Sequence, residues 1–327
     1  LVGSEMCIRD RHYMAESDTI DSDHSGLSLR QSEEGVISVE HLTYTYPFHK
    51  EPALNDVSLA VRKGDFVIVT GPNGAGKTTL LMSMAGAIPH YYGGTMEGMV
   101  FTDGKAVTQH NIADLASSIG VILSDYKAQI VTLTVGEEMA FTLENHGFPP
   151  EEIRRRSKEA LAKVHLEGLE ERKVATLSGG QCQRLVVAAV LAEEPDVPVS
   201  YTDRSRGLVD VYKRQEGIRE FYEMVGELNE KEGLTVIVAE HHLEAALPYA
   251  KKFVLMNHGE IIVSGTPEEV MRRMYTEHIY EEAIPDMYKA QLELEQVGMT
   301  FEKPFLNLAD AETSVIHSFA KGGEKDA

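Results

Sequence analysis

Apolar residues change their spacing along this chain, and the spacing predicts which segments are strands and which are helices. Residues 36–47 and 55–64 alternate or cluster β-forming residues before turn residues, which predicts antiparallel strands. Residues 66–70 and 235–239 are short and almost wholly apolar, as strands buried on both faces are. Residues 251–265 predict a hairpin that turns at residues 257–259.

Helical spacing predicts the elements between these strands. Helices are expected at residues 78–87, 135–145, 151–164, 179–194 and 217–232, and Pro267 is placed to begin another. Strands that alternate with helices indicate a mainly parallel sheet covered on both faces. Residues 14–35 read as a polar, acidic and disordered leader, and residues 276–327 as a polar, helix-prone C-terminal extension. The expected fold class is therefore α/β, with an antiparallel β-subdomain at its start.

Composition narrows the class of protein. The 327 residues are 43% hydrophobic and 25% charged, the balance of a globular protein. No stretch approaches the roughly 20 apolar residues that cross a bilayer, and no signal peptide is visible, so a cytosolic chain is expected. Cys7 and Cys182 are too few for a disulfide framework. The formal net charge of -21 argues against a nucleic-acid partner.

A glycine-rich motif separates the apolar run 66–70 from the helix that follows it. The segment GPNGAGKTT matches the G-x-x-x-x-G-K-[ST] pattern in the expected strand–loop–helix context. Its glycines let backbone N–H groups turn toward phosphates, its lysine reaches the β- and γ-phosphates, and its first threonine holds Mg²⁺. ATP and Mg²⁺ are the expected ligands, and the expected nucleotide-binding residues are Gly71, Pro72, Asn73, Gly74, Ala75, Gly76, Lys77, Thr78 and Thr79.

A second motif, LSGGQCQR, begins at residue 177 and also precedes a helix. Alone, Ser-Gly-Gly before a helix is an ordinary N-cap. Together the two motifs resemble the nucleotide-binding domain of ABC ATPases, over about residues 36–275, with a P-loop NTPase core and a helical signature subdomain at about 134–177. The resemblance implies a dimer in which the signature completes the partner's ATP site, and the signature residues are Leu177, Ser178, Gly179, Gly180 and Gln181.

Single positions follow from the same resemblance. Tyr46 matches the adenine-stacking aromatic, although a strand aromatic packed on the core is the alternative. His241 matches the histidine that contacts the γ-phosphate and, with Lys77, is the expected catalytic residue. Ser124 stands at the position that is usually glutamine, and Gln129 is the candidate substitute. Cys182 is expected to be a surface or interface thiol and not a nucleophile.

The stretch after residue 196 lacks a feature that the resemblance requires. ABC ATPases have an aliphatic strand that ends in Asp-Glu, which assist Mg²⁺ and the attacking water. Here Pro198 cannot donate to a central ladder, and the following residues do not extend an apolar run, so no strand is expected. Asp203 and Asp210 are the acids present, and neither has matching neighbours.

The first residues of the chain and this stretch can be encoded by the same nucleotide string. EMCIRDR at residues 5–11 and DVYKRQ at residues 210–215 can both be encoded by GATGTGTATAAGAGACAG, read in two frames. That string resembles the transposase mosaic end of sequencing-library adapters. Residues 1–11 and about 198–215 are therefore interpreted as adapter-derived, which removes them from functional reasoning. A natural, hydrolysis-deficient subunit with an unusual insertion is the rival interpretation.

The function expected is an ATP-binding and hydrolysing subunit of an ABC importer, peripheral on the cytoplasmic face of the membrane. Residues 129–145 and 238–250 look most like ATPases of energy-coupling factor importers. That resemblance implies a second ATPase subunit, identical or different, a transmembrane coupling subunit and a substrate-binding membrane component. The alternatives are a hydrolysis-deficient regulatory subunit and a soluble ABC ATPase outside transport. A soluble ABC ATPase would be expected to carry a second P-loop or a coiled-coil insertion, and neither is visible in the sequence.

Overall fold

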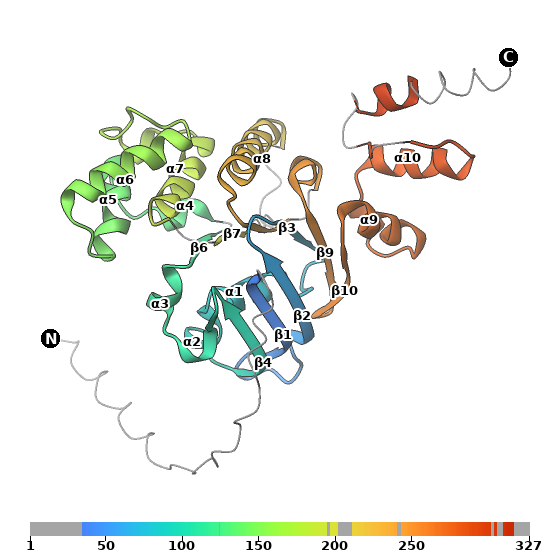
Figure 1. Cartoon of the computed structure of the whole chain (residues 1–327), viewed down its shortest axis with the longest axis horizontal. Coiled ribbons are helices and arrows are strands. Elements are labelled where there is room, and N and C mark those ends of the chain that lie inside the picture. The colour runs from blue at the N-terminus through green and yellow to red at the C-terminus, as the bar shows by residue number, and fades with distance from the viewer. Residues whose placement is uncertain are drawn as a thin grey trace, which may run out of the picture. The chain divides into compact units, whose positions relative to one another are not determined.

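The computed structural model describes residues 35–123, 125–194, 197–201, 211–240, 243–301, 304–305 and 310–316, with residues 197–201 and 211–216 described by their backbone. Two sheets organise them (Figure 1). The first sheet is antiparallel in the order β2-β1-β4-β5. Its strands are β1 (Gly35–Thr45), β2 (Leu54–Arg62), β4 (Thr95–Thr102) and β5 (Lys105–Ala106). The predicted antiparallel start of the fold is confirmed.

The second sheet has six strands in the order β10-β9-β3-β8-β7-β6. Every neighbouring pair in it is parallel except β9 and β10, which form the predicted hairpin. Its strands are β3 (Phe66–Thr70), β6 (Ile119–Ile122), β7 (Val197–Tyr201), β8 (Val236–Ala239), β9 (Lys252–Asn257) and β10 (Glu260–Gly265). All residues of β3 and β8 are buried, as their apolar runs predict.

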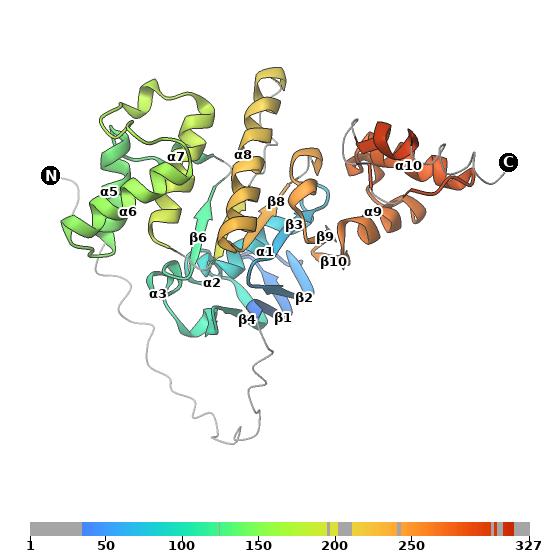
Figure 2. The same ribbon diagram turned by 45° about the horizontal axis from the view of Figure 1, so that its top comes forward.

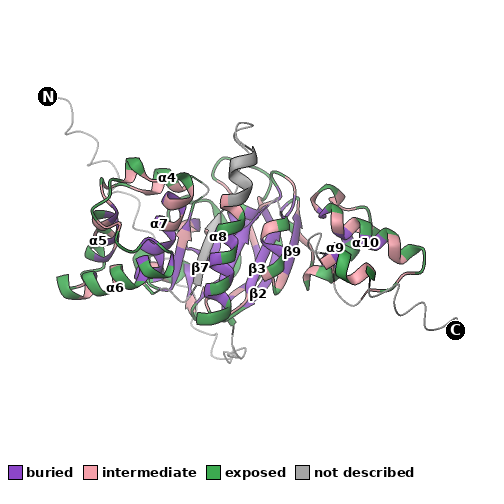
Figure 3. Ribbon diagram, turned by 90° about the horizontal axis from the view of Figure 1, so that it is seen from above, coloured by how far each residue is buried: buried purple, intermediate pink, exposed green. Residues whose placement is uncertain are grey.

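The second sheet separates two apolar cores. Phe66 and Ile68 of β3 pack into one core, and Val67 and Val69 into the other, because successive strand residues point to opposite faces. Helices α7 and α8 cover the first face, and α1 covers the second. Figure 2 shows α5, α6 and α7 gathered beside β6, and Figure 3 shows buried residues concentrated in the strands.

Ten named α-helices lie within the described residues, and residues 310–316 are helical as well. Several begin where side chains cap them: Thr134 and Glu137 form a capping box at α5, and Thr266 and Glu269 form one at α9. The helices are α1 (Lys77–Met84), α2 (Ala87–His90), α3 (Ile112–Ala116), α4 (Tyr126–Gln129), α5 (Val135–Asn145), α6 (Pro150–Lys163), α7 (Gly179–Ala192), α8 (Val211–Glu232), α9 (Pro267–Thr276) and α10 (Asp286–Gln296). None of the helices in this part of the chain is long and apolar enough to cross a membrane.

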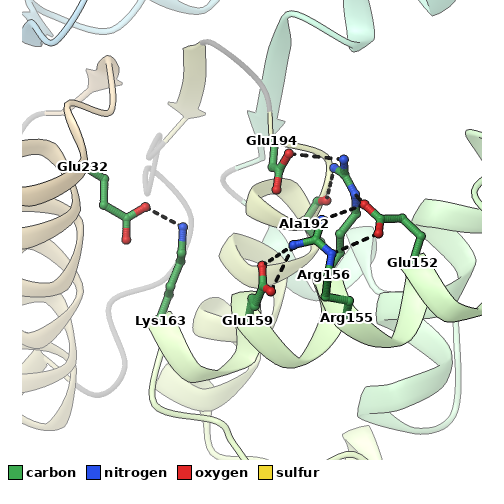
Figure 4. Close-up of polar contacts among 8 residues, drawn as sticks. All are labelled: Glu152, Arg155, Arg156, Glu159, Lys163, Ala192, Glu194 and Glu232. Atoms are coloured by element: carbon green, nitrogen blue, oxygen red, sulfur yellow. Dashed lines mark hydrogen bonds and ion pairs between the residues drawn. The ribbon is translucent and has the colours of Figure 1, made fainter.

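Polar contacts join α6 to α7 and α8 (Figure 4). The Arg156 guanidinium donates to Ala192 O at 3.2 Å and lies 3.2 Å from the Glu194 carboxylate, just after the end of α7. Lys163 pairs with Glu232, the last residue of α8. Arg156 also lies over the Phe148 ring, 4.3 Å from its centroid. Partly exposed ion pairs of this kind typically add about 0.2 to 1 kcal/mol to stability.

The prediction that no strand follows residue 196 is wrong. Strand β7 runs between β6 and β8, and its register places Pro198 opposite Gly120 and Ser200 opposite both Ile122 and Val238. Proline removes one ladder donor, whereas both neighbours still pair along the rest of the strand. Helix α8 likewise begins at Val211, six residues before its predicted start.

The described residues of the C-terminal extension are helical at 286–296 and 310–316, and several of them are buried. Tyr288 and Leu292 of α10 are buried, and so is Phe305. The Arg272 guanidinium of α9 pairs with Glu295 of α10 at 2.7 Å, and the buried Gln291 amide oxygen accepts from Phe305 N at 2.7 Å. Burial raises the pKa of the Tyr288 hydroxyl. One apolar face of α10 therefore packs against α9, which residue-by-residue polarity did not indicate.

Candidate nucleotide-binding site

The loop between β3 and α1 is held close to neighbouring backbone. Gly71, Gly74 and Gly76 have φ values of 143°, 80° and 98°, which side chains other than glycine rarely adopt. A Cβ at Gly71 would lie 2.0 Å from Met256 O, and one at Gly76 would lie 2.8 Å from Ala53 O. Gly259 N, in the β9–β10 turn, donates to Ala75 O at 3.1 Å. Backbone groups of β9 and of the β9–β10 turn thus restrict the conformation of the loop that the sequence motif predicts.

Lys77 closes this loop. The residue is 6% exposed, and its Nζ donates to Gly71 O at 2.8 Å and to Pro72 O at 2.9 Å. The first turn of α1 carries no acidic residue. A buried ammonium beside the N-terminus of a helix is a site for anions, because the ammonium charge and the helix dipole act together. The residues present therefore fit the phosphates of a nucleotide.

Thr78 and Thr79 occupy the first turn of α1. Thr78 is exposed, so a ligand can reach its hydroxyl, whereas Thr79 is buried. The Thr79 Oγ1 atom lies 3.1 Å from the Tyr46 hydroxyl. Tyr46 is half-buried and meets the rings of Tyr44 and Tyr92 edge to face. The sequence-predicted aromatic therefore lies beside the predicted phosphate loop.

The signature residues lie at the start of α7. Ser178 is the N-cap: its hydroxyl accepts from Gln181 N at 3.2 Å, while Ser178 N donates to Gln181 Oε1 at 3.0 Å. Ser178 and Gly179 are exposed. Apart from the local helix backbone, no heavy atom of the described residues lies within 4 Å of a Cβ built at Gly180. The motif is thus presented on the surface, where another molecule can contact it.

Comparisons with known proteins identify the family. A family model for the ABC transporter matches residues 54–199. A putative ABC transporter ATP-binding protein of Pyrococcus abyssi is 36% identical over 81% of this chain and 92% of its own length. The chain belongs to the ABC transporter ATP-binding proteins. An energy-coupling factor transporter ATP-binding protein of Lacticaseibacillus paracasei is 33% identical over 83% of this chain and 94% of the relative.

Solved structures agree with this assignment. The structure of cbiO1 from Clostridium perfringens, described as part of the ABC transporter complex cbiONQ, aligns with a TM-score of 0.66 and 28% identity, covering 81% of this chain and 98% of that one. A nucleotide-free ATP-binding cassette aligns with a TM-score of 0.63 and 25% identity, covering 77% of this chain and 100% of that one. A putative ABC transporter ATP-binding protein of Methanosarcina acetivorans is longer than this chain, and the alignment covers 38% of its length. The α/β fold with a P-loop core is confirmed.

The structure describes only some of the other residues that the sequence predicts for the site of this ABC ATPase. Ser124, His241, Asp203 and Asp210 lie outside the described residues. Gln129 folds back on the end of β6: its Nε2 donates to Val121 O at 2.9 Å and its Oε1 accepts from Leu123 N at 3.1 Å. Its amide is thus occupied by backbone groups in this conformation. The described residues contain no group of three or more His, Cys, Asp or Glu side chains that could hold a metal. Thr78 stays the Mg²⁺ candidate on the basis of the sequence motif alone.

Cys182 is not a surface thiol. It is 5% exposed on α7, and burial raises the pKa of its thiol, an effect that Lys127 partly offsets. Cys182 lies on the side of α7 that faces the core, so it is buried even though other residues of the signature motif are exposed. The expectation that it is not a nucleophile remains a prediction, and the raised pKa favours it.

Sequence reasoning missed three side chains around the site. Glu138 is 5% exposed and accepts from Val131 N, Thr132 N and Thr132 Oγ1, which holds the loop before α5. Glu240 directly follows β8 and accepts from Tyr222 OH at 2.8 Å, with both groups buried. The Tyr126 hydroxyl lies 3.2 Å from a Cβ built at Gly179. An acid directly after an apolar run was the available signal for Glu240, and none marked Tyr126.

Proposed function

We propose that this ABC ATPase binds and hydrolyses ATP as the energy-providing subunit of an importer of the energy-coupling factor type. One observation carries the proposal: the same chain holds a loop closed by the buried Lys77 and a surface-exposed signature at Ser178 and Gly179. A loop that binds phosphates in one chain and a signature open to another suit two chains that close over two nucleotides. Opening after hydrolysis then drives transport. Residues 36–275 would form the ATP-binding domain, and residues 134–177 its helical subdomain.

Exposed apolar side chains support a membrane-embedded partner. Val131 is 63% exposed and Leu133 is 79% exposed, in the loop that Glu138 holds, and Phe141 on α5 is 46% exposed. Exposed apolar residues gathered near one loop are typical of an interaction surface. We assign this surface to a transmembrane coupling subunit that also binds a substrate-binding membrane component. The chain would then lie on the cytoplasmic face of the membrane, beside a second ATPase subunit.

The stretch at about 198–215 belongs to the proposal, because it replaces the expected carboxylates. The family match ends at residue 199, where the adapter-like translation begins. A cavity of about 20 Å³ with an apolar lining lies between α7, α8 and the strands that flank β7, and Ile122 and Val238 line it. These two residues are the register neighbours of position 200. A larger aliphatic residue at that position, as in an ordinary ABC ATPase, would suit the cavity.

Phosphate release tests the proposal. We expect the chain as written to bind ATP and to hydrolyse it near background, since a water-activating base contributes roughly 10²- to 10⁴-fold in rate. A second version replaces residues 197–215 with an aliphatic strand that ends in Asp-Glu, followed by a short loop, and should hydrolyse ATP. Lys77→Ala in that version is the matched control and should abolish activity, because it removes the ammonium charge that lies among the phosphates.

The outcomes separate the candidate functions. Equal and measurable turnover by the two versions would contradict the interpretation of the stretch as adapter-derived and would place the base elsewhere. ATP binding without hydrolysis by both versions would favour the hydrolysis-deficient regulatory subunit. Failure of the active version to co-purify with any membrane subunit encoded beside it would favour a soluble ABC ATPase. Sequencing of the source locus tests directly whether residues 198–215 are encoded there.

A further inference from the structure

The contact between Tyr46 and Thr79 joins two segments that lie 33 residues apart. Tyr46 directly follows β1, whereas Thr79 is the third residue of α1, directly after the phosphate loop. Their hydroxyl oxygens are 3.1 Å apart, and either one can be the donor. The resemblance gives the Tyr46 ring a role toward adenine, but it gives no role to the hydroxyl.

The surroundings of Tyr46 fix where its hydroxyl lies. The Tyr44 ring meets it edge to face with centroids 4.9 Å apart, and the Tyr92 ring meets it at 6.2 Å with an interplanar angle of 89°. Tyr44 is itself anchored, since its hydroxyl donates to Gly93 O at 2.8 Å and its side chain is buried. A ring held by neighbours on its edges presents its hydroxyl in one direction, toward α1.

Thr79 lies where α1 offers donors to an anion. The first intrahelical bond runs from Leu80 N to Gly76 O at 2.9 Å, so the N–H groups of Thr78 and Thr79 precede the hydrogen-bonded part of the helix. These N–H groups and the buried Lys77 ammonium lie at the same end of the helix. Thr79, a buried residue, is thus at the phosphate end of α1.

Counting protons shows what the pair can donate. Each hydroxyl has one hydrogen and can accept through two lone pairs. The contact between Tyr46 and Thr79 uses one of the two hydrogens, whichever residue donates. One hydrogen therefore remains for a third group. Because linked hydroxyls polarise one another, a donor in such a chain is stronger than a lone hydroxyl, above all toward an anion.

We propose that Tyr46 and Thr79 form a two-hydroxyl relay that donates one hydrogen bond to a phosphate of the bound nucleotide. Tyr46 thereby contributes to binding through the phosphates as well as through any contact with the base. The inference rests on the proposed nucleotide binding at the loop. The substitution Tyr46→Phe separates the contribution of the ring from that of the hydroxyl, because phenylalanine keeps the ring and lacks the hydroxyl.

Inorganic tripolyphosphate is the decisive probe, because it has the phosphates and lacks the base. Its affinity and that of ATP are measured by displacement of a fluorescent ATP analogue from the full chain. Tyr46→Phe should weaken both ligands by the same factor, roughly two- to tenfold, which corresponds to one hydrogen bond. Tyr92→Phe is the matched control, since it removes a hydroxyl from the same aromatic group and should leave both affinities unchanged.

Variants of Thr79 test the relay itself. Thr79→Val should weaken tripolyphosphate, and Tyr46→Phe should then cause no further loss, whereas Thr79→Ser should retain the affinity. Unchanged tripolyphosphate binding by Tyr46→Phe, or independent effects of the two substitutions, would overturn the relay while leaving the proposed function intact. Failure of the unsubstituted chain to bind ATP would overturn both.

Discussion

Replacing Gly226 tests how tightly α8 packs on the rest of the fold. Gly226 faces the ring of Tyr249, in the turn Leu247–Tyr249 that follows β8. A Cβ at this position would lie 2.1 Å from Tyr249 Cδ1 and 2.5 Å from Cε1. The ring cannot retreat freely, because Phe66 of β3 lies on it with centroids 6.2 Å apart. Gly226→Ala must therefore move the ring or the helix.

The size of the effect follows from two opposing contributions. Extra atoms in a packed core cost about 1 to 3 kcal/mol of stability. Alanine in place of glycine inside a helix restores up to about 1 kcal/mol. We expect Gly226→Ala to lower the free energy of unfolding by about 1 to 2 kcal/mol, which lowers Tm by roughly 2 to 8 °C at about 2 to 4 °C per kcal/mol for a large domain.

Gly217 is the matched control on the same helix. Apart from the backbone of α8 itself, no heavy atom of the described residues lies within 4 Å of a Cβ built there, so Gly217→Ala should stabilise the chain by about 0.5 to 1 kcal/mol. The chain has no tryptophan, so urea unfolding is followed by far-UV circular dichroism. A gain in stability for Gly226→Ala similar to that for Gly217→Ala would refute the reasoning. Tyr249→Ala should largely remove the penalty, which a double-mutant cycle measures.

Two further predictions concern the signature helix. Ser178→Arg should block ATP-dependent dimer formation and leave ATP binding by the monomer unchanged, because a bulky cation would fill the place of the partner's γ-phosphate; sedimentation with a non-hydrolysable analogue checks this, and a normal dimer would count against the composite site. Burial raises the pKa of Glu193, beside His146 at 3.6 Å, from 4.5 to about 7. Between these values the folded chain holds a proton that the unfolded chain has released, so stability should fall as pH rises from 4.5 to 7, by about 3 kcal/mol in total. Glu193→Gln should flatten that dependence in urea unfolding, and an unchanged slope would contradict it.

Local signals predicted much of the fold. The bounds of β3 were correct because an apolar run ends at Gly71, and those of α5 because Thr134 and Glu137 cap its start. Strand β7 was missed because the rule that disfavours proline in a strand considers one residue at a time. Whether the strand forms depends instead on its pairing with both neighbours, β6 and β8. The packing of α10 was missed because its apolar residues are few and widely spaced in a polar sequence.

The candidate site was predictable only where residues that are close in sequence act together. Both motifs were found because a tight loop or a helix start determines their geometry. The contact of Tyr46 with Thr79 and that of Tyr222 with Glu240 join distant segments, so no local spacing indicates them. Likewise, the pattern suggested Gln129 as a substitute, but its side chain folds back on the end of β6.

The capping box at Ser178 has a consequence for how two chains could meet. Ser178 and Gln181 satisfy each other's backbone N–H groups within one chain, and this bond leaves the hydrogen of the Ser178 hydroxyl unused. The signature is therefore preorganised: the side chain that would meet the other chain's nucleotide already has its rotamer fixed. Less conformational entropy is then lost on association, so the energy of nucleotide contact can go into closing the dimer rather than into ordering the loop.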